Sequence, residues 1–327
     1  MKNINEKMWA ILVHLSENFA WEGEKCVCDD ETWDYIIDEA EKAGFNTIVL
    51  DVEDAVEYAS HPEISVNSIW SKHRVKKEIE KCRRKGIRII PKLNFSSTHD
   101  KWLGEYARMI STTPYYRVCN DLIKEIYAMF EGPEYIHIGM DEENNYQMSN
   151  GDSEIVIYRK DKLFWHDMRF LVDCVEEAGA KAWIWHDMAL AKSDDFKKHF
   201  EPGEVLISPW YYRSFHEEHF SPMPPERQAE FGNLNLKYLE EGFIFANVRE
   251  KACPLAHEGF TYVPTGSVWS NNEYNAFELI EHFELGAPDS QIVGYMTAPW
   301  CLTKPENKES FKKSFDSIKE ARAHFYK

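Results

Sequence analysis

The sequence predicts an α/β protein built as a single (β/α)₈ TIM barrel over residues 1–327. Short apolar segments alternate with longer amphipathic segments about eight times along the chain, as the strand–helix units of a barrel do. No Gly/Ser-rich or Pro-rich tract marks a domain boundary. The alternative, an open doubly wound sheet, usually has a glycine-rich phosphate loop after its first strand, and the sequence has none there.

Eight segments have the length and apolar character of buried parallel strands. In chain order they are 8–15, 45–52, 86–93, 134–140, 180–186, 204–210, 260–265 and 292–298. The seventh requires a choice, because GFIFANV at 242–248 and GFTYVPTG at 259–266 both resemble strands. We prefer the second, since its spacing to the next helix and to the last strand matches that of the other units.

Amphipathic segments between the strands predict the helices. In chain order they are 30–43, 71–85, 115–131, 159–178, 192–200, 227–241, 271–285 and 305–325. Asp29 and Asp30 mark the start of the first helix, and Gly44 and Gly179 lie where two helices should end.

The charge and composition of the chain limit the classes of molecule that it can bind. The formal net charge of −18 opposes binding to nucleic acid or to an acidic membrane surface, because both need clustered Lys and Arg. The N-terminal segment lacks the layout of a signal peptide, and no apolar run approaches the roughly 18 residues of a membrane helix. The seven cysteines are scattered, which favours reduced thiols. We expect a soluble cytoplasmic protein; its oligomeric state stays open.

Polar and aromatic residues follow most of the predicted strands. Because the C-terminal ends of barrel strands converge on one face, these residues should meet in space. They are His14, Ser16, Glu17, Asp51, Glu53, Asp54, Lys92, Asn94, His99, Asp141, Glu142, Glu143, Trp185, His186, Asp187, Trp210, Tyr211, Tyr212, Tyr262, Trp269, Tyr295 and Trp300. Acids ringed by aromatic faces suit a sugar, whose C–H faces pack on Trp and Tyr while carboxylates bind its hydroxyls.

The fourth strand carries the strongest catalytic signal. Side chains alternate along a strand, so His137, Gly139 and Asp141 share one face and should point into the barrel mouth. Glu142 comes one residue later, where the chain leaves the pleat. A neighbouring Asp and Glu can divide the work of proton transfer, with one ionised and the other protonated.

The run His-Ile-Gly-Met-Asp-Glu at 137–142 resembles the strand-4 signature of family 20 glycoside hydrolases, the β-N-acetylhexosaminidases. Further stretches are similar to one bacterial branch of that family. They are FNTIVLDVEDAVEY at 45–58, IWHDM at 184–188, SPWYY at 208–212 and GYMTAPW at 294–300. The resemblance implies a catalytic barrel that acts on a small carbohydrate, with no metal and no cofactor.

The resemblance also implies an exo-acting mechanism of substrate-assisted retention, in which the sugar's own acetamide oxygen attacks the anomeric carbon. Glu142 would be the acid/base, and Asp141 would orient the acetamide. The other implied substrate-binding residues are His137, Trp185, Asp187, Trp210, Trp300 and either Tyr211 or Tyr295. One departure concerns Glu17, because family members usually carry an Arg there that grips sugar hydroxyls. Arg only donates and an ionised Glu only accepts hydrogen bonds, so Glu17 is a candidate for selecting the terminal sugar.

Three alternatives stay open from the residues. A retaining glycosidase could pair Glu142 with Asp187 or Asp51 as an enzyme nucleophile and act on another sugar. A metal-dependent barrel enzyme could use His137, Asp141, His186 and Asp187. A carbohydrate-binding homologue with weak or no catalysis is the third. Cys26 and Cys28 form a C-x-C pair, but without a second ligand pair they do not predict a zinc site.

Overall fold

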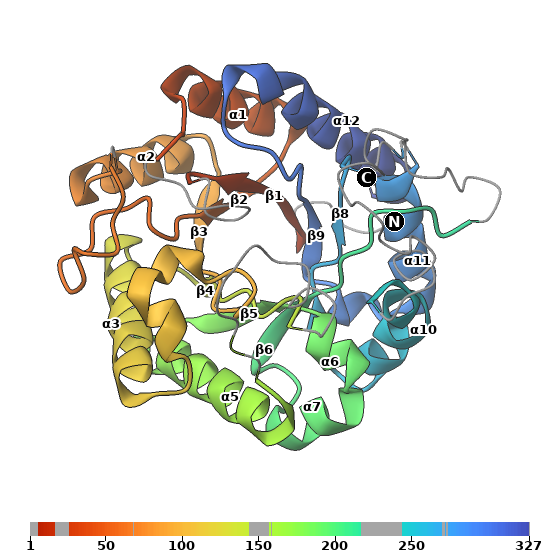
Figure 1. Cartoon of the computed structure of the whole chain (residues 1–327). Helices are drawn as coiled ribbons and strands as arrows, with labels where there is room; N and C mark the ends of the chain where they lie inside the picture. Colours follow the sequence, from red (N-terminus) through yellow and green to blue (C-terminus); the bar gives the residue numbers. More distant parts are fainter. Residues whose placement is uncertain are drawn as a thin grey trace, which may run out of the picture.

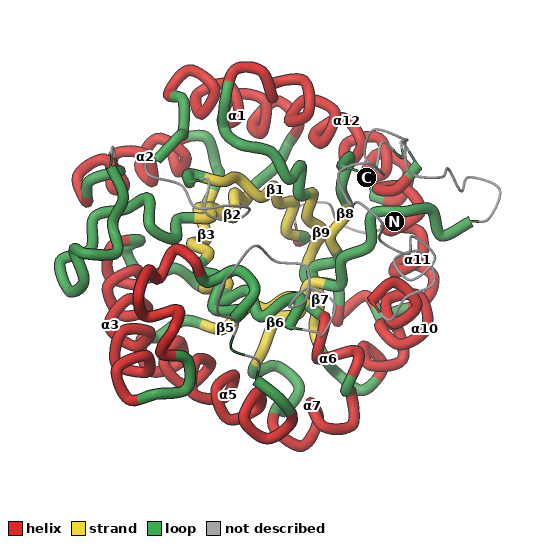
Figure 2. Tube along the Cα trace, viewed as in Figure 1, coloured by secondary structure: helices red, strands yellow, loops and turns green. Residues whose placement is uncertain are grey.

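Parallel strands form a ring enclosed by helices, as Figure 1 and Figure 2 show for this computed structural model. The structure describes residues 6–16, 26–67, 69–143, 157, 159–216, 244–269, 272 and 274–326. The strands are β1 (Met8–His14), β2 (Thr47–Asp51), β3 (Arg88–Lys92), β4 (Tyr135–His137), β5 (Lys181–Trp185), β6 (Val205–Ser208), β7 (Thr261–Tyr262), β8 (Thr265–Gly266) and β9 (Gly294–Thr297). The predicted (β/α)₈ barrel is confirmed.

The strand order is β7-β6-β5-β4-β3-β2-β1-β9-β8, with every ladder parallel. Strands β7 and β8 together fill the seventh position of the barrel. They pair with β6 and β9, and bridges from Trp210 to Thr265 and from Tyr262 to Ile292 join them to both neighbours. The ring is therefore closed.

The choice of the second segment as the seventh strand is confirmed. The competing segment begins the helix α10 (Ile244–His257). A short apolar run does not by itself distinguish a strand from a buried helix, which is why both segments resembled strands. The predicted helix 227–241 lies outside the described residues.

The remaining helices surround the ring (Figure 1). They are α1 (Asp30–Ala43), α2 (Lys72–Arg84), α3 (Thr113–Met129), α5 (Asp161–Ala178), α6 (Asp187–Ala191), α7 (Ser193–His199), α11 (Asn275–Gly286) and α12 (Lys308–Phe325), with 3₁₀ helices η2 (Lys101–Met109), η4 (Asp289–Gln291) and η5 (Pro305–Asn307). Asp29 caps α1 by accepting a hydrogen bond from the Thr32 amide at 2.8 Å. Among the described residues, no helix is long and apolar enough to cross a membrane.

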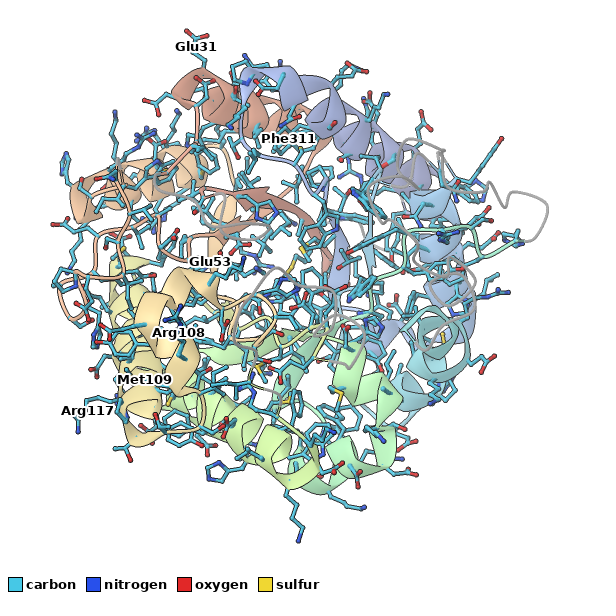
Figure 3. All side chains as sticks on the ribbon, viewed as in Figure 1. Glu31, Glu53, Arg108, Met109, Arg117 and Phe311 are labelled. Atoms are coloured by element: carbon cyan, nitrogen blue, oxygen red, sulfur yellow. The ribbon has the colours of Figure 1, made fainter. Side chains whose placement is uncertain are left out.

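Side-chain alternation divides the core into two clusters. One lies inside the ring and includes Trp183 and Trp185 of β5, and the other lies between the ring and the helices and includes Ile184. Figure 3 shows Glu53 inside the ring of helices, whereas Glu31 and Arg117 project from its outer rim. The position of a residue along its strand therefore decides whether it can reach the barrel mouth.

Candidate active site

The chain makes two unusual turns where it leaves β4. Gly139 (φ 72°), Met140 (φ 68°) and Glu142 (φ 57°) all have left-handed backbone, which costs free energy for residues with a side chain. A Cβ on Gly139 would overlap the side-chain amide of Asn94 and lie 2.9 Å from its Cα. The glycine of the strand-4 run is thus required both by its φ and by the close approach of Asn94, in the loop after β3. These turns direct Asp141 and Glu142 into the mouth.

Asp141 is held by the loop that follows β3. The side-chain amide of Asn94 donates to Oδ1 of Asp141 at 2.8 Å, and the Ser96 hydroxyl donates to the Asp141 carbonyl. Burial raises the pKa of Asp141, and the charge of His99 opposes that rise. One carboxylate oxygen therefore has a fixed donor, while the other faces His99.

His99 joins the two acids. Its Nε2 lies 3.0 Å from Oε2 of Glu142 and 3.6 Å from Oδ2 of Asp141. Burial alone would lower the pKa of this imidazole, but the charge of Asp141 and the hydrogen bond to Glu142 raise it to about 9. At neutral pH the site therefore contains an imidazolium between two carboxyl groups.

Asp187, at the start of α6, supports Glu142 and the aromatic wall. Its Oδ1 accepts the backbone N–H of Glu142 at 3.1 Å, and its Oδ2 accepts the indole N–H of Trp210 at 2.8 Å. Burial and the nearby charges of Asp141 and Glu142 raise the pKa of Asp187 well above its usual range. Both oxygens of Asp187 are thus engaged within the protein.

A buried charged group lies deeper in the mouth, on β1 to β3. Nζ of Lys92 lies 2.6 Å from Oδ2 of Asp51 and 3.7 Å from Oε1 of Glu53, and Nδ1 of His14 lies 3.0 Å from the same Asp51 oxygen. Burial would raise the pKa of Asp51, but Lys92 and His14 lower it below its usual range. Burial and the charge of Asp51 raise the pKa of Glu53 well above normal. The positive charge of Lys92 is therefore compensated mainly by the Asp51 carboxylate.

Four aromatic rings form one wall of the mouth. The rings of Trp210 and Tyr212 stack with centroids 5.1 Å apart, and Tyr212 lies 6.3 Å from Trp300. Trp300 lies 5.8 Å from Trp185. All four belong to the cluster inside the ring, with Trp300 only partly buried. Such a wall can pack against the apolar faces of a sugar ring.

The predicted site residues fall into two groups. The structure brings together Asp141, Glu142, Trp185, Asp187, Trp210 and Trp300 at the mouth, with His137 beneath them. His137 supports the turn, because its Nδ1 accepts the Gly139 N–H at 3.1 Å. Glu17 lies outside the described residues.

Tyr211 and Tyr295 do not join this group. The Tyr211 hydroxyl donates to the Ser214 carbonyl at 3.0 Å, and the Tyr295 hydroxyl donates to Oε1 of Glu284 at 2.7 Å. Both rings belong to the cluster outside the ring of strands. Each is a neighbour in sequence of an inward-facing residue, so side-chain alternation turns it outward.

Tyr212, His99 and Asn94 were among the residues expected at the mouth, but the sequence assigned them no catalytic or substrate-binding role. Tyr212 shares the inward face with Trp210, two residues earlier, and alternation would have identified it. Asn94 and His99 follow β3 in a loop that has no regular periodicity. Only the fold shows which acids these two side chains contact.

A metal site was one alternative. Among the described residues, the one group of potential ligands whose donor atoms lie within 4.8 Å of one another consists of His99, Asp141 and Glu142. The set predicted from sequence, His137, Asp141, His186 and Asp187, does not form such a group in the part of the chain that the structure describes. His99 would have to lose its proton before it could bind a metal ion.

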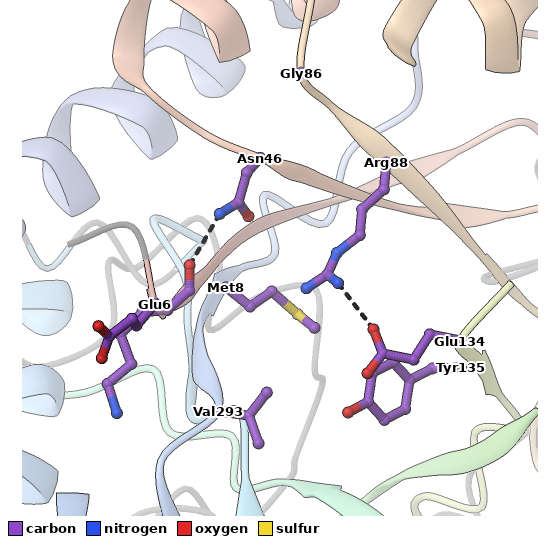
Figure 4. Close-up of a pocket in the computed structure, with 9 residues that line it drawn as sticks. Glu6, Met8, Asn46, Gly86, Arg88, Glu134, Tyr135 and Val293 are labelled. Carbon is purple, nitrogen blue, oxygen red and sulfur yellow. Dashed lines mark hydrogen bonds and ion pairs between the residues drawn. The ribbon is translucent and has the colours of Figure 1, made fainter. Parts of the chain in front are cut away.

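A second hollow of about 450 Å³ opens at the other end of the barrel, where β1, β3 and β4 begin (Figure 4). Two of its charged groups pair with each other, since Arg88 donates to Glu134 at 2.9 Å, and the Asn46 side chain donates to the Lys7 carbonyl at 2.9 Å. Barrel enzymes place their chemistry at the opposite, C-terminal face. The mouth around Asp141 and Glu142 is therefore the candidate active site.

Residues 27–221 match the family model for the catalytic domain of glycosyl hydrolase family 20. The chain belongs to glycoside hydrolase family 20. It is therefore a glycosidase, and the resemblance seen at 137–142 is confirmed. Among curated proteins, none matches the chain.

Solved structures of this family share the fold at low sequence identity. A family 20 β-N-acetylglucosaminidase has a TM-score of 0.64 at 12% identity, over 96% of this chain and 69% of that one. A mutant Streptomyces plicatus β-hexosaminidase in complex with its product GlcNAc has a TM-score of 0.62 at 14% identity, over 95% and 63%. A Vibrio harveyi exo-β-N-acetylglucosaminidase in complex with N-acetylglucosamine has a TM-score of 0.59 at 15% identity, over 98% and 57%. The chain thus spans between about three fifths and two thirds of these family 20 proteins.

Proposed function

We propose that this family 20 glycosidase is an exo-acting β-N-acetylhexosaminidase that uses substrate-assisted retention. The observation that carries the proposal is the arrangement of Asp141, Glu142 and His99 beside an aromatic wall. Two similar structures, from Streptomyces plicatus and Vibrio harveyi, are complexes with N-acetylglucosamine. An acetamido sugar is accordingly the substrate that we propose.

In the first step, the acetamide oxygen of the substrate forms a bond to the anomeric carbon while the bond to the leaving oxygen breaks. Glu142 gives its proton to that leaving oxygen. The cyclised intermediate carries a positive charge, and the ionised Asp141 stabilises it while accepting the acetamide N–H. In the second step, Glu142 takes a proton from water as the water oxygen bonds to the anomeric carbon and the acetamide is released.

The fixed partners of the two acids suit these roles. The side-chain amide of Asn94 donates a hydrogen bond to Oδ1 of Asp141 at 2.8 Å, so the other oxygen is oriented toward His99 and the site. The His99 imidazole lies 3.0 Å from Glu142, within hydrogen-bond distance of the oxygen that transfers the proton. Asp187 fixes the backbone of Glu142.

The aromatic wall gives the acetamide its pocket. Trp185, Trp210 and Trp300 pack around the N-acetyl group in this proposal, and Tyr212 replaces Tyr211 and Tyr295 as the hydrogen-bond donor to the acetamide oxygen. Burial raises the pKa of Tyr212 well above its usual range, so its hydroxyl keeps its proton at working pH. His137 contributes by supporting Trp185, whose ring centroid lies 4.7 Å away.

Hydrolysis of four fluorogenic glycosides tests the proposal. The 4-methylumbelliferyl β-N-acetylglucosaminide and β-N-acetylgalactosaminide should be cleaved, whereas the plain β-glucoside and β-galactoside should not, because they lack the acetamide that acts as nucleophile. Glu142→Gln should abolish the cleavage. Cleavage of the plain glycosides would instead indicate an enzyme nucleophile, and no cleavage of any of the four would refute the proposal.

A further inference from the structure

We infer that Arg159 is a positioning residue, whose guanidinium locks the loop carrying His99 to the loop carrying Asp141 and Glu142. The inference rests on the proposed function, because it assigns Arg159 a role in holding the acid pair for the same reaction. The hydrogen bonds of Arg159 go to Glu143, Asp167 and the Phe95 carbonyl, and not to Asp141 or Glu142. Arg159 acts on these two acids through Glu143, the residue that directly follows Glu142.

Arg159 binds both loops at once. Its Nε donates to Oε2 of Glu143 at 3.0 Å, and its Nη2 donates to Oε1 of the same carboxylate. The same Nη2 donates to the Phe95 carbonyl, in the loop after β3, at 2.8 Å. Glu143 also accepts the backbone N–H of Ser97 at 2.9 Å. The forked guanidinium and the carboxylate thus connect the two loops by bidentate contacts that a lysine cannot reproduce.

The other side of Arg159 is anchored in the helical layer. Its Nη1 lies 3.5 Å from Oδ2 of Asp167 on α5. That carboxylate also accepts the Ser111 hydroxyl at 2.6 Å and the Tyr116 hydroxyl at 2.5 Å. Arg159, Glu143 and Asp167 are all buried, with exposed fractions of 1%, 2% and 0%. These contacts fix the position of the Arg159 guanidinium, and therefore the direction from which it binds Glu143.

The catalytic geometry depends on this connection. Glu142 adopts left-handed backbone at φ 57°, a strained conformation that persists only when its surroundings hold it. Asp187 accepts a hydrogen bond from the Glu142 N–H, and Arg159 donates to the side chain of the next residue, Glu143. Both contacts hold the backbone of Glu142 in this conformation. The contact of 3.0 Å between His99 and Glu142 joins the same two loops that Arg159 joins. A small shift between them separates the imidazolium from the acids.

A buried ion pair with a purely structural role would affect stability alone, so the test needs a readout of the site itself. Arg159→Lys keeps the charge and loses the fork, and Glu143→Gln keeps the shape and loses the charge. Arg169→Lys, on the helix α5 that carries Asp167, is the matched control, since Arg169 pairs with Asp173 at 2.8 Å and Glu204 at 3.1 Å on the outside. NMR titration of the His99 imidazole, assigned by the signal that His99→Gln removes, reports the distance to the acids without any substrate.

We expect Arg159→Lys and Glu143→Gln to lower the pKa of His99 by about one unit, because the imidazolium moves away from its carboxylates. The same variants should lower kcat by about 10- to 100-fold, as small misplacements of catalytic groups do. Arg169→Lys should change neither quantity. If Arg159→Lys does not fold, Glu143→Gln decides by the same two readouts.

Wild-type pKa and kcat in folded Arg159→Lys or Glu143→Gln would overturn the inference, whatever their melting temperatures. A wild-type enzyme that cleaves none of the four glycosides would refute the proposed function instead. The His99 titration would still decide whether Arg159 positions the loops. The two ideas can therefore fail separately.

Discussion

His99 and Glu142 meet across two loops although 43 residues separate them in the chain, with 3.0 Å between Nε2 of the imidazole and Oε2 of the carboxylate. The same nitrogen lies 3.6 Å from Asp141. One cation thus contacts both acids, and its pKa of about 9 keeps it protonated at neutral pH. This relationship leads to the first two predictions.

Replacing His99 by Gln should lower kcat on the acetamido substrates by about 100-fold. Glutamine retains an N–H donor but cannot carry the positive charge that His99 places beside Glu142 and Asp141. In the wild type, kcat should fall as pH rises through about 9, where His99 loses its proton, and the variant should lack this alkaline step. The measurement is kcat against pH for both proteins. Equal kcat at pH 7 would show that the charge of His99 is not needed.

The stability of the fold should depend on the same proton. The pKa of His99 rises from an ordinary value of 6.5 to about 9 in the folded state, so its contribution is complete below pH 6.5 and is lost as pH rises through 9. The wild type should lose up to about 3 kcal/mol of unfolding free energy over this range relative to His99→Gln. Urea unfolding of both proteins at pH 6 and pH 9.5 measures that difference. Parallel pH dependence in the two proteins would contradict it.

Tyr212 and Tyr211 form a matched pair for testing the aromatic wall. Tyr212→Phe should lower kcat at least about tenfold, because it removes the proposed donor to the acetamide oxygen. Tyr211→Phe removes the hydrogen bond to the Ser214 carbonyl, away from the mouth, so it should cost about 1 kcal/mol of stability and leave kcat unchanged. Steady-state kinetics and thermal unfolding of both variants separate the two effects. The reverse pattern would place Tyr211 in the site.

Gly139 and Gly86 both have a φ of 72°, but only Gly139 is crowded. An added methyl group at Gly139 meets Asn94, whereas at Gly86 nothing lies within 4 Å. Gly86→Ala should therefore cost only the backbone strain, about 1 kcal/mol. Gly139→Ala should cost about 3 kcal/mol and abolish activity, since it displaces Asn94 from Asp141. Chemical denaturation and activity assays of both variants test this, and equal losses would show that space is not the deciding factor.

Much of the fold follows from local patterns that the sequence displays. Repeated apolar runs and helix signals such as Asp29 identify the strand–helix units. Alternation predicted that Asp141 points into the mouth, but β4 ends at His137, and the left-handed backbone of Gly139 and Met140 determines where Asp141 lies. The same rule, applied to β9, would have excluded Tyr295, because the neighbouring Met296 lies inside the ring. At 242–248 the apolar run carried no information on whether it forms a strand or a helix.

The remaining contacts depend on positions that no periodicity encodes. His99 follows β3 by several residues, and Arg159 precedes α5 after a segment that is only partly described. Their partners are determined by how two loops and a helix pack together. Each buried charge also requires an opposite charge nearby. An isolated buried arginine is costly, but the sequence alone does not show which carboxylate will pair with it.

The ring of strands is interrupted at its seventh position, between β6 and β9. Strands β7 and β8 contain two residues each, and Trp210 and Trp300 follow the strands on its two sides, β6 and β9. Parting of the ring at this point would pull the aromatic wall apart and expose two sheet edges. A ligand packed against both indoles would hold the two sides of the seventh position together. Amide hydrogens such as those of Val263 and Thr265, which donate to the Ile207 and Pro209 carbonyls of the β6 side, should then exchange more slowly when the mouth is filled.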